Sequence, residues 1–240
     1  MKNSYKKYLY IFLIAALYIF TVQMNRMERK DRVREAAINR SQDMEEEGKE
    51  EESLFEDKKR VALTFDDGPG EGTEGLLDGL KERNAKATFF VVGEKVEQYP
   101  DTIQRMKEEG HLIGNHTYTH VQMNTLSCEA AIAEVKKTSE LIESIIGEGT
   151  GYLRPPYGEC TKQMKKELDM FIVLWDVDPL DWSVQNEDAV VEKVLRDVED
   201  GDIILLHDIF DTSVRAAIRI VDALQKEGYE FVTVEELMFP

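Results

Sequence analysis

From residue 61 onward the chain alternates short apolar runs with segments of helical periodicity, and this alternation limits the fold more than any other feature. We expect buried strands at residues 61–65, 88–92, 111–114, 152–153, 171–175, 203–206 and 231–234. We expect helices at residues 73–83, 101–109, 127–146 (with Ser127 as the cap), 162–168, 186–198 and 213–226. About seven such strand–helix units, without a glycine-rich dinucleotide-binding turn, predict an α/β fold with a parallel sheet curled into a distorted (β/α) barrel.

The amino terminus predicts a membrane anchor. Lys2, Lys6 and Lys7 precede an uncharged apolar run over residues 8–24, whose 17 residues are at the short end of what crosses a bilayer. A cleaved secretion signal shares the charged start and the apolar middle. No small-x-small pair follows the run, which favours an uncleaved transmembrane signal anchor. Basic residues lie on both sides of the run, so charge alone leaves its orientation open.

Residues 25–59 predict a charged stalk. They are almost free of large apolar side chains and cannot bury a core. The chain then divides into an amino terminus with its anchor (1–24), the stalk (25–59) and one globular domain (60–240) of ordinary size.

The formal charge of −18 is concentrated in the globular part. Residues 1–60 carry 13 Lys and Arg against 12 Asp and Glu, whereas residues 61–240 carry 17 against 36. A domain this acidic is repelled by nucleic-acid backbones and gains nothing from anionic lipid headgroups. We therefore expect no nucleic-acid partner and a neutral or cationic substrate, and nothing in the sequence indicates a protein partner.

Polar residues follow the first and third expected strands, where barrel enzymes place their active sites. Asp66 and Asp67 follow the first strand, and His116 and His120 follow the third. Two histidines four apart meet on one face of a helical turn and can share a metal ion. Taken singly, an ordinary Asp-Asp-Gly turn and a pair of surface histidines are the alternatives. Together, Asp67, His116 and His120 predict a site with two nitrogen ligands, one oxygen ligand and an open position, as in catalytic zinc sites.

The ends of later strands carry further polar or aromatic residues, namely Arg154, Asp178, Asp181, Trp182 and His207. Beside the predicted metal site, Asp66 can act as a general base and His207 can protonate a leaving group. Each motif alone is compatible with ordinary loop chemistry, but their joint occurrence at successive strand ends argues against coincidence. His111 begins its strand and is given no role.

These residues resemble the polysaccharide deacetylase family, the carbohydrate esterases that remove N- or O-acetyl groups from chitin-like, peptidoglycan and xylan polymers. The resemblance extends from about residue 61 to residue 234. Five motifs of that family occur in order, at residues 64–68, 116–120, 154–157, 178–182 and 205–207. The resemblance implies a distorted barrel of strand–helix units, in agreement with the alternation described above.

The resemblance also implies a role for each motif residue. It makes Asp66 the catalytic base and His207 the catalytic acid. It makes Asp67, His116 and His120 the ligands of one divalent metal ion, with zinc expected and cobalt, nickel or manganese as alternatives.

The remaining motif residues complete the implied site. Arg154 would orient the base, and Asp181 would tune the acid. The Tyr157 N–H would help to hold the oxyanion, while Trp182 and Leu205 would wall the acetyl pocket. The implied reaction is attack of metal-activated water on the acetamide carbonyl, followed by departure of the amine with a proton from the acid.

An anchor that places the domain outside the cell, near the wall, makes peptidoglycan amino sugars the expected substrate. Chitooligosaccharides and acetylated xylan are alternatives, as are a non-catalytic wall-binding protein and a soluble amidohydrolase of small molecules. Intact Asp66 and His207 argue against pure binding, and the apolar run argues against a soluble enzyme. Cys128 and Cys160 are either two unpaired residues or a disulfide, and their spacing does not decide between these.

Overall fold

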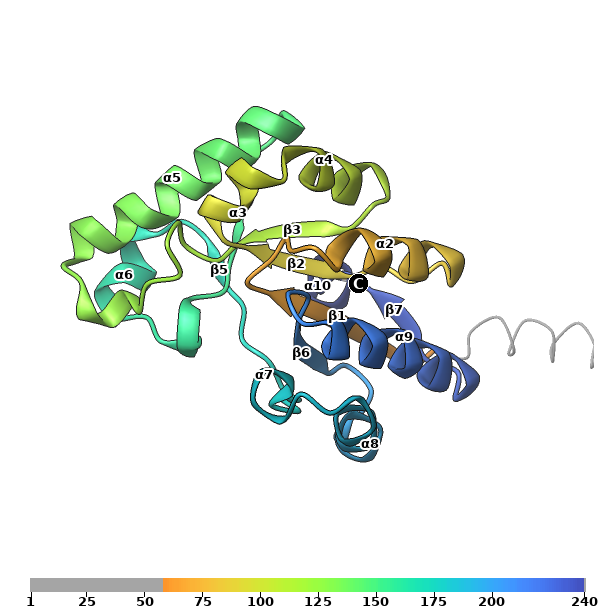
Figure 1. Cartoon of the computed structure of the whole chain (residues 1–240). Helices are drawn as coiled ribbons and strands as arrows, with labels where there is room; N and C mark the ends of the chain where they lie inside the picture. Colours follow the sequence, from red (N-terminus) through yellow and green to blue (C-terminus); the bar gives the residue numbers. More distant parts are fainter. Residues whose placement is uncertain (1–57, 240) are drawn as a thin grey trace, which may run out of the picture. The chain divides into compact units, whose positions relative to one another are not determined.

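The computed structural model describes residues 58–239, which fold around seven parallel strands (Figure 1). The strands are β1 (Arg60–Asp66), β2 (Thr88–Val91), β3 (Leu112–Asn115), β4 (Tyr152–Leu153), β5 (Phe171–Ile172), β6 (Ile203–His207) and β7 (Glu230–Val232). Their order is β5-β4-β3-β2-β1-β6, and β7 pairs with the first residues of β1. Beyond β5, Val177 makes a parallel bridge to Ile204 of β6, so one bridge joins the two ends of the curled sheet. This arrangement fits the predicted distorted barrel.

Helices cover the outside of the curled sheet. They are α2 (Thr73–Glu82), α3 (Gly93–Gln98), α4 (Pro100–Glu108), α5 (Cys128–Ile146), α6 (Lys162–Glu167), α7 (Asp181–Val184), α8 (Glu187–Asp197), α9 (Asp211–Lys226) and α10 (Val234–Met238). Two short 3-10 turns lie at Met123–Thr125 and Pro156–Gly158. Helices α4 and α5 pack on β3, whereas α9 packs on β6 and α8 packs on α9 (Figure 1).

Caps and apolar faces explain why these segments are helical. At the start of α5, Ser127 Oγ accepts the N–H of Ala130, as its position in the sequence predicts. Gly147 ends the helix with a φ of 76°, a conformation that glycine adopts without steric cost. In the main core Phe65 of β1 stacks on Phe89 of β2, with 5.2 Å between the ring centroids. Burial of each such side chain stabilises the fold by about 1.5–3 kcal/mol.

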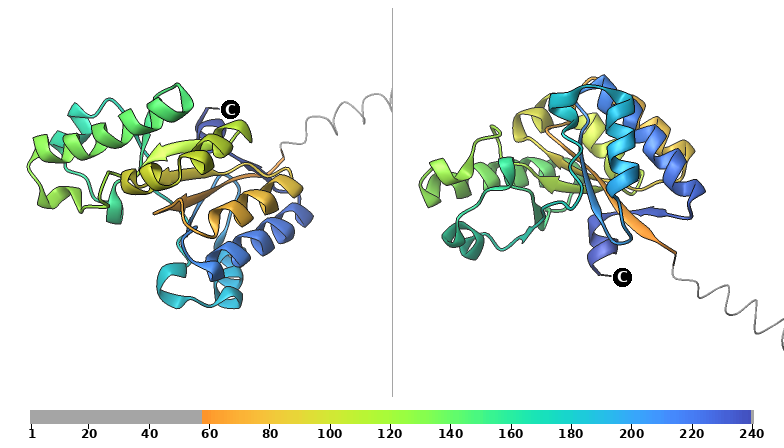
Figure 2. Two further views of the ribbon diagram at one scale, coloured as in Figure 1. Left: turned by 45° about the horizontal axis from the view of Figure 1, so that its top comes forward. Right: turned by 90° about the horizontal axis from the view of Figure 1, so that it is seen from below.

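Helix α10 closes the amino-terminal end of the barrel. The Val234 N–H donates to Thr88 Oγ1 over 3.0 Å, and the Val234 side chain is buried in one cluster with Ala62 and Phe90. Figure 2 shows α10 beside the start of β1, away from the carboxyl ends of the strands. The open end of the barrel is therefore the end at which β1, β3 and β6 finish.

The strand predicted at residues 171–175 is wrong beyond Ile172. The carbonyl oxygens of Val173 and Leu174 accept hydrogen bonds from the side chain of Arg154, at 3.3 and 2.9 Å. Because these carbonyl oxygens bond to a buried arginine, the pairing of β5 with β4 ends, and the following segment crosses toward β6.

The helical turn predicted for residues 116–120 is also wrong. These residues form a loop in which Thr117 and His120 have φ values of 64° and 56°, outside the helical region. The sequence also gave no sign of α3, α7 and α10. Each of these helices has six residues or fewer and therefore little periodic pattern, although α6, also of six residues, lies where the sequence predicts a helix.

The predicted anchor at residues 8–24 lies outside the described residues, as does nearly all of the stalk at residues 25–59. Both stay predictions, and so does the domain boundary at residue 60. Within residues 58–239, no helix combines the length and the apolar character needed to cross a membrane.

Candidate active site

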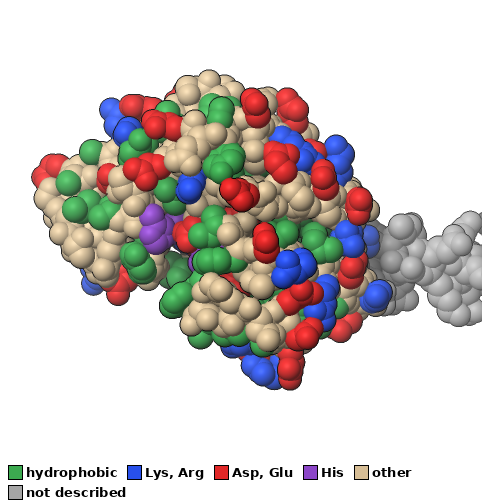
Figure 3. Space-filling model, in the orientation of Figure 1, with side chains coloured by type: hydrophobic (Ala, Val, Ile, Leu, Met, Phe, Trp, Pro, Cys, Tyr) green, Lys and Arg blue, Asp and Glu red, His purple; other side chains and the backbone are tan. Residues whose placement is uncertain are grey.

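Strand register brings the predicted site residues to the open end of the barrel. Asp66, the last residue of β1, lies opposite His207, the last residue of β6, and Asn115 at the end of β3 lies opposite Leu153 of β4. A cavity of about 440 Å³ opens here, lined by Asp66, Asp67, His116, His120, Tyr157, Trp175, Asp178, Leu180, Trp182, Leu205, His207 and Phe210. Histidine and carboxylate side chains meet at a hollow on the face shown in Figure 3.

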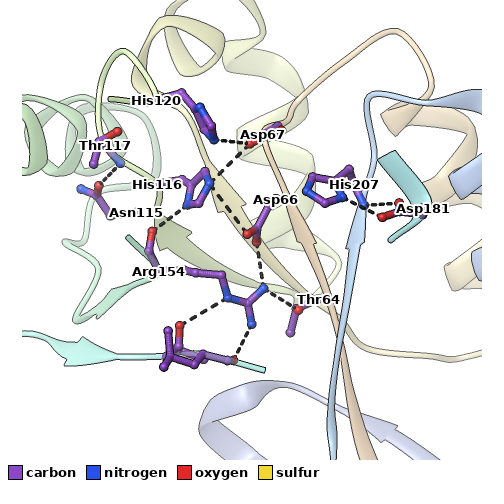
Figure 4. Close-up of polar contacts among 12 residues, drawn as sticks. Thr64, Asp66, Asp67, Asn115, His116, Thr117, His120, Arg154, Asp181 and His207 are labelled. Carbon is purple, nitrogen blue, oxygen red and sulfur yellow. Dashed lines mark hydrogen bonds and ion pairs between the residues drawn. The ribbon is translucent and has the colours of Figure 1, made fainter. Parts of the chain in front are cut away.

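Asp67, His116 and His120 form a cluster of candidate metal ligands (Figure 4). Asp67 Oδ1 lies 3.4 Å from His116 Nε2 and 3.0 Å from His120 Nε2, yet it is buried without a well-aligned hydrogen bond. An ion with ligands at about 2.0–2.2 Å in a tetrahedron separates its ligand atoms by about 3.3–3.6 Å. Three ligand atoms converge here within 4.8 Å of one another, and this set of one oxygen and two nitrogens fits a divalent cation such as zinc.

The protonation of this cluster is set by neighbouring groups. His116 Nδ1 lies 2.6 Å from the backbone oxygen of Arg154, so Nδ1 donates to this oxygen and Nε2 faces Asp67. Burial alone would raise the pKa of Asp67, but contact with the imidazoles of His116 and His120 holds it far below its ordinary value. The cluster therefore directs one carboxylate and two imidazole rings toward a common point.

Backbone strain is concentrated around the cavity. Among residues 58–239, seven non-glycine residues have positive φ, and five of them lie in the loops at the open end: Asp67, Thr117, His120, Tyr157 and Leu180. Each such conformation costs on the order of 1–3 kcal/mol and persists only where surrounding contacts enforce it. One such contact is visible here, since Asn115 Oδ1 accepts the Thr117 N–H over 2.8 Å. The loops are therefore held in geometries that local preference alone would not produce.

Asp66 is held by a fully buried arginine. Arg154 Nη1 lies 2.8 Å from Asp66 Oδ1 and donates also to Thr64 Oγ1 over 2.7 Å. Burial lowers the pKa of Arg154, while the charge of Asp66 opposes this shift. The second oxygen of Asp66 lies 3.7 Å from His116 Nε2 and faces the metal-ligand cluster. One oxygen of Asp66 is thus anchored by Arg154, and the other is directed into the cavity.

His207 is paired with a buried carboxylate on the opposite side of the cavity. Asp181 Oδ1 lies 2.8 Å from His207 Nδ1, and Asp181 Oδ2 accepts the His207 N–H over 2.9 Å. Burial alone would lower the pKa of His207, but Asp181, with smaller contributions from Asp67 and Asp66, raises it to about 9. The imidazolium is oriented with its Nε2 side toward the cavity (Figure 4).

Apolar and aromatic side chains form the rim of the cavity. Tyr157 and Trp182 are 64% and 51% exposed although both are large, and Leu205 lines the cavity from β6. The Tyr157 ring meets the His120 ring edge-on at 5.1 Å between centroids. Exposed aromatic groups beside polar groups are typical of sites that bind sugars or other organic ligands.

Comparison with known proteins identifies the family of the chain. A family profile described as polysaccharide deacetylase matches residues 55–171. The chain is 42% identical over 188 residues to the peptidoglycan-N-acetylmuramic acid deacetylase PdaC of Bacillus subtilis (strain 168), covering 78% of this chain and 40% of that one. It is 38% identical to a peptidoglycan-N-acetylglucosamine deacetylase of Bacillus cereus, covering 75% of this chain and 68% of that one. The solved structure of Bacillus subtilis PdaC superposes with a TM-score of 0.75 at 42% identity, covering 76% of this chain and 91% of that one.

The chain belongs to the polysaccharide deacetylase family. It spans about two fifths of the length of the curated PdaC relative. Family membership accounts for the fold shared with the solved structure of PdaC.

All ten residues predicted for the site meet at the open end of the barrel. Eight of them line the cavity directly: Asp66, Asp67, His116, His120, Tyr157, Trp182, Leu205 and His207. Arg154 and Asp181 lie behind it, each fully buried and each holding one lining residue.

Sequence reasoning missed several supporting residues. Thr64 lies within the motif at residues 64–68, and Asn115 directly precedes the motif at residues 116–120. Their positions in the sequence could therefore have indicated that they support the site. Trp175 belongs to the strand predicted at residues 171–175 but instead lines the cavity, and its ring faces the Arg154 guanidinium at 5.6 Å. Asp208, directly after His207, is buried and contacts the turn that follows Asp67.

The residues without a predicted role also have clear positions. His111 is buried away from the cavity, where its Nδ1 accepts the Ala87 N–H over 3.1 Å and burial lowers its pKa to about 4. Cys128 and Cys160 are free thiols in the structure and pack against the same small apolar cluster.

Proposed function

We propose that this chain is a metal-dependent deacetylase that removes N-acetyl groups from an amino-sugar polymer, with cell-wall peptidoglycan as the substrate. The observation that carries the proposal is the arrangement of three different functional groups around one cavity. The Asp67, His116 and His120 cluster, the carboxylate of Asp66 and the imidazole of His207 all line this cavity, and Asp66 lies 3.7 Å from His116. A binding protein would need neither a base nor an acid at these positions.

A divalent ion, with zinc as our first expectation, would be held by Asp67, His116 and His120 and would lower the pKa of a water and polarise the acetyl carbonyl. Asp66 accepts the proton of the attacking water through the oxygen that faces the cavity. Arg154 fixes the orientation of Asp66 through the 2.8 Å contact to its other oxygen.

The leaving amine needs a proton, and His207 supplies it. Its raised pKa keeps the imidazole protonated at neutral pH, and Asp181 holds the ring in position. The Tyr157 N–H, which donates to no other described residue, is available for the oxyanion that forms on the acetyl oxygen. Trp182 and Leu205 form apolar walls for the acetyl methyl group.

Peptidoglycan is favoured by the relatives, which are named for N-acetylmuramic acid and N-acetylglucosamine deacetylation. The predicted anchor at residues 8–24 suits the same substrate, because a deacetylase of the wall requires the orientation in which the anchor holds the domain outside the cell, next to the wall. Chitooligosaccharides and acetylated xylan are the alternative substrates for the same chemistry.

The test is release of acetate by the purified full-length chain from peptidoglycan, chitooligosaccharides and acetylated xylan at equal acetyl concentration. We expect release to be fastest from peptidoglycan, with mass spectrometry of the digested product identifying the deacetylated sugar. The same preparation carrying Asp66→Asn serves as the control for contaminating esterases. Acetate release from none of the three polymers would contradict the proposal, and faster release from one of the other two would change the substrate.

A further inference from the structure

Asp208 is a buried carboxylate with no part in the chemistry described above. It directly follows His207 at the end of β6 and is only 1% exposed. Oδ2 accepts the Thr73 hydroxyl over 2.5 Å, whereas Oδ1 has no hydrogen-bond partner within the described chain. A buried carboxylate with a free oxygen is costly, so its position calls for an explanation.

The carboxylate of Asp208 lies directly against Gly68, the residue after Asp67. A Cβ atom added to Gly68 would overlap both carboxylate oxygens and Cγ, so only glycine fits at this contact. Gly68 is also held from the other side, because its carbonyl oxygen accepts the Val92 N–H over 3.1 Å. The turn after Asp67 is therefore held on two sides, by Asp208 directly after β6 and by Val92 directly after β2.

Thr73 also holds Gly70, two residues after Gly68 in the same turn. Its fully buried hydroxyl donates to Asp208 Oδ2 and accepts the Gly70 N–H over 2.8 Å. A single hydroxyl thus connects the end of β6 to the turn at residues 68–70. Replacing the hydroxyl by a methyl group would break both hydrogen bonds without changing the side-chain shape.

We propose that Asp208 and Thr73 are positioning residues. They hold the backbone of Asp67 in its left-handed conformation, so that the Asp67 carboxylate faces His116 and His120. Asp67 has a φ of 73°, which a non-glycine residue keeps only when its surroundings enforce it. The enforcing contacts lie on the carboxyl side of Asp67, at Gly68 and Gly70. This inference rests on the proposed metal site, for which Asp67 supplies the only carboxylate ligand.

The test compares zinc binding by the full chain with Thr73→Val and Thr73→Ser. Calorimetric titration of metal-free protein gives the dissociation constant, and thermal unfolding of the same samples reports stability. We expect Thr73→Val to weaken zinc binding on the order of 10–100-fold, as is usual for supporting groups behind a metal ligand. Thr73→Ser keeps the hydroxyl and should bind zinc as the unchanged protein does.

Thr102→Val is the matched control. Thr102 is also buried and also donates to a carboxylate, Glu74 Oε1, over 2.7 Å, but it lies on α4 away from the cavity. The Thr102→Val variant should be less stable than the unchanged protein but should bind zinc with the same affinity. Unchanged zinc affinity in Thr73→Val, or equal weakening in Thr73→Val and Thr73→Ser, would overturn the positioning role. Absence of zinc binding by the unchanged protein would overturn the metal site itself, and this inference with it.

Discussion

His116 and Arg154 are joined by a contact of 2.6 Å between the imidazole Nδ1 of one and the backbone oxygen of the other. The guanidinium of the same Arg154 lies 2.8 Å from Asp66. Arg154 therefore supports two functions at once, since its main chain orients a candidate metal ligand and its side chain holds the candidate base. Disturbing this residue should affect both the fold and the site.

We predict that Arg154→Met destabilises the fold by about 3–5 kcal/mol, because it leaves Asp66 buried without its partner. Adding Asp66→Asn should recover part of the loss, so the two changes should be non-additive in a double-mutant cycle measured by urea unfolding. Arg219→Met is the control, since Arg219 pairs with Glu187 and Asp188 at the surface and should matter little. Strict additivity for Arg154 and Asp66 would show that their contact contributes nothing.

The two neighbouring aspartates should respond differently to the same substitution. Asp67→Asn should bind zinc more weakly, because a neutral amide oxygen is a poorer ligand than a carboxylate. Asp66→Asn should keep its metal, while acetate release falls on the order of a hundredfold or more through loss of the base. Metal content by elemental analysis is compared with turnover for each purified variant. Metal loss in Asp66→Asn and retention in Asp67→Asn would show that the roles are reversed.

In the metal-free protein, His207 should titrate with a pKa of about 9. The folded-state value exceeds the value of about 6.5 expected for an unfolded chain, so the stabilisation from this pair is complete below about pH 6.5 and is lost as the pH rises through about 9. Asp181→Asn should lower the pKa of His207 and flatten this pH dependence. Nuclear magnetic resonance titration of the imidazoles measures the effect.

His111 provides an internal reference for that titration. Burial lowers its pKa to about 4, and it lies outside the cavity, so Asp181→Asn should leave it unchanged. A His207 pKa that does not move in Asp181→Asn would show that Asp181 does not control the acid.

Chelation should abolish acetate release, and added zinc should restore it, because the proposed cluster supplies the only route to an activated water. His120→Ala should weaken zinc binding sharply, since it removes one of three protein ligands and the most exposed imidazole of the cluster. Calorimetry and acetate release are measured on the same samples. Full activity of protein shown by elemental analysis to be metal-free would refute the metal-dependent mechanism.

The predicted anchor is tested separately from the chemistry. If residues 8–24 form an uncleaved anchor, the chain should stay in the membrane fraction after washing with carbonate, and protease added outside the cell should cut within residues 25–59. A chain lacking residues 1–24 should instead be released by the wash. Recovery of a shorter soluble form that begins near residue 25 would indicate a cleaved signal.

Most of the barrel could be predicted from the sequence because its signals are local. Apolar runs set the strands, and Ser127 and Gly147 bound α5 as their chemistry requires. The chemically active residues could be chosen because they are rare and follow strands. Parallel strands direct such residues to the same end of a barrel.

The way those residues are held depends on contacts that form only in the folded chain. Arg154 ends the strand predicted at residues 171–175, and it reaches Asp66 across 88 positions of sequence. Asp208 meets Thr73 across 135 positions. Local preference cannot encode such contacts or the left-handed conformation of Asp67, because each is stable only when the folded chain supplies its partner.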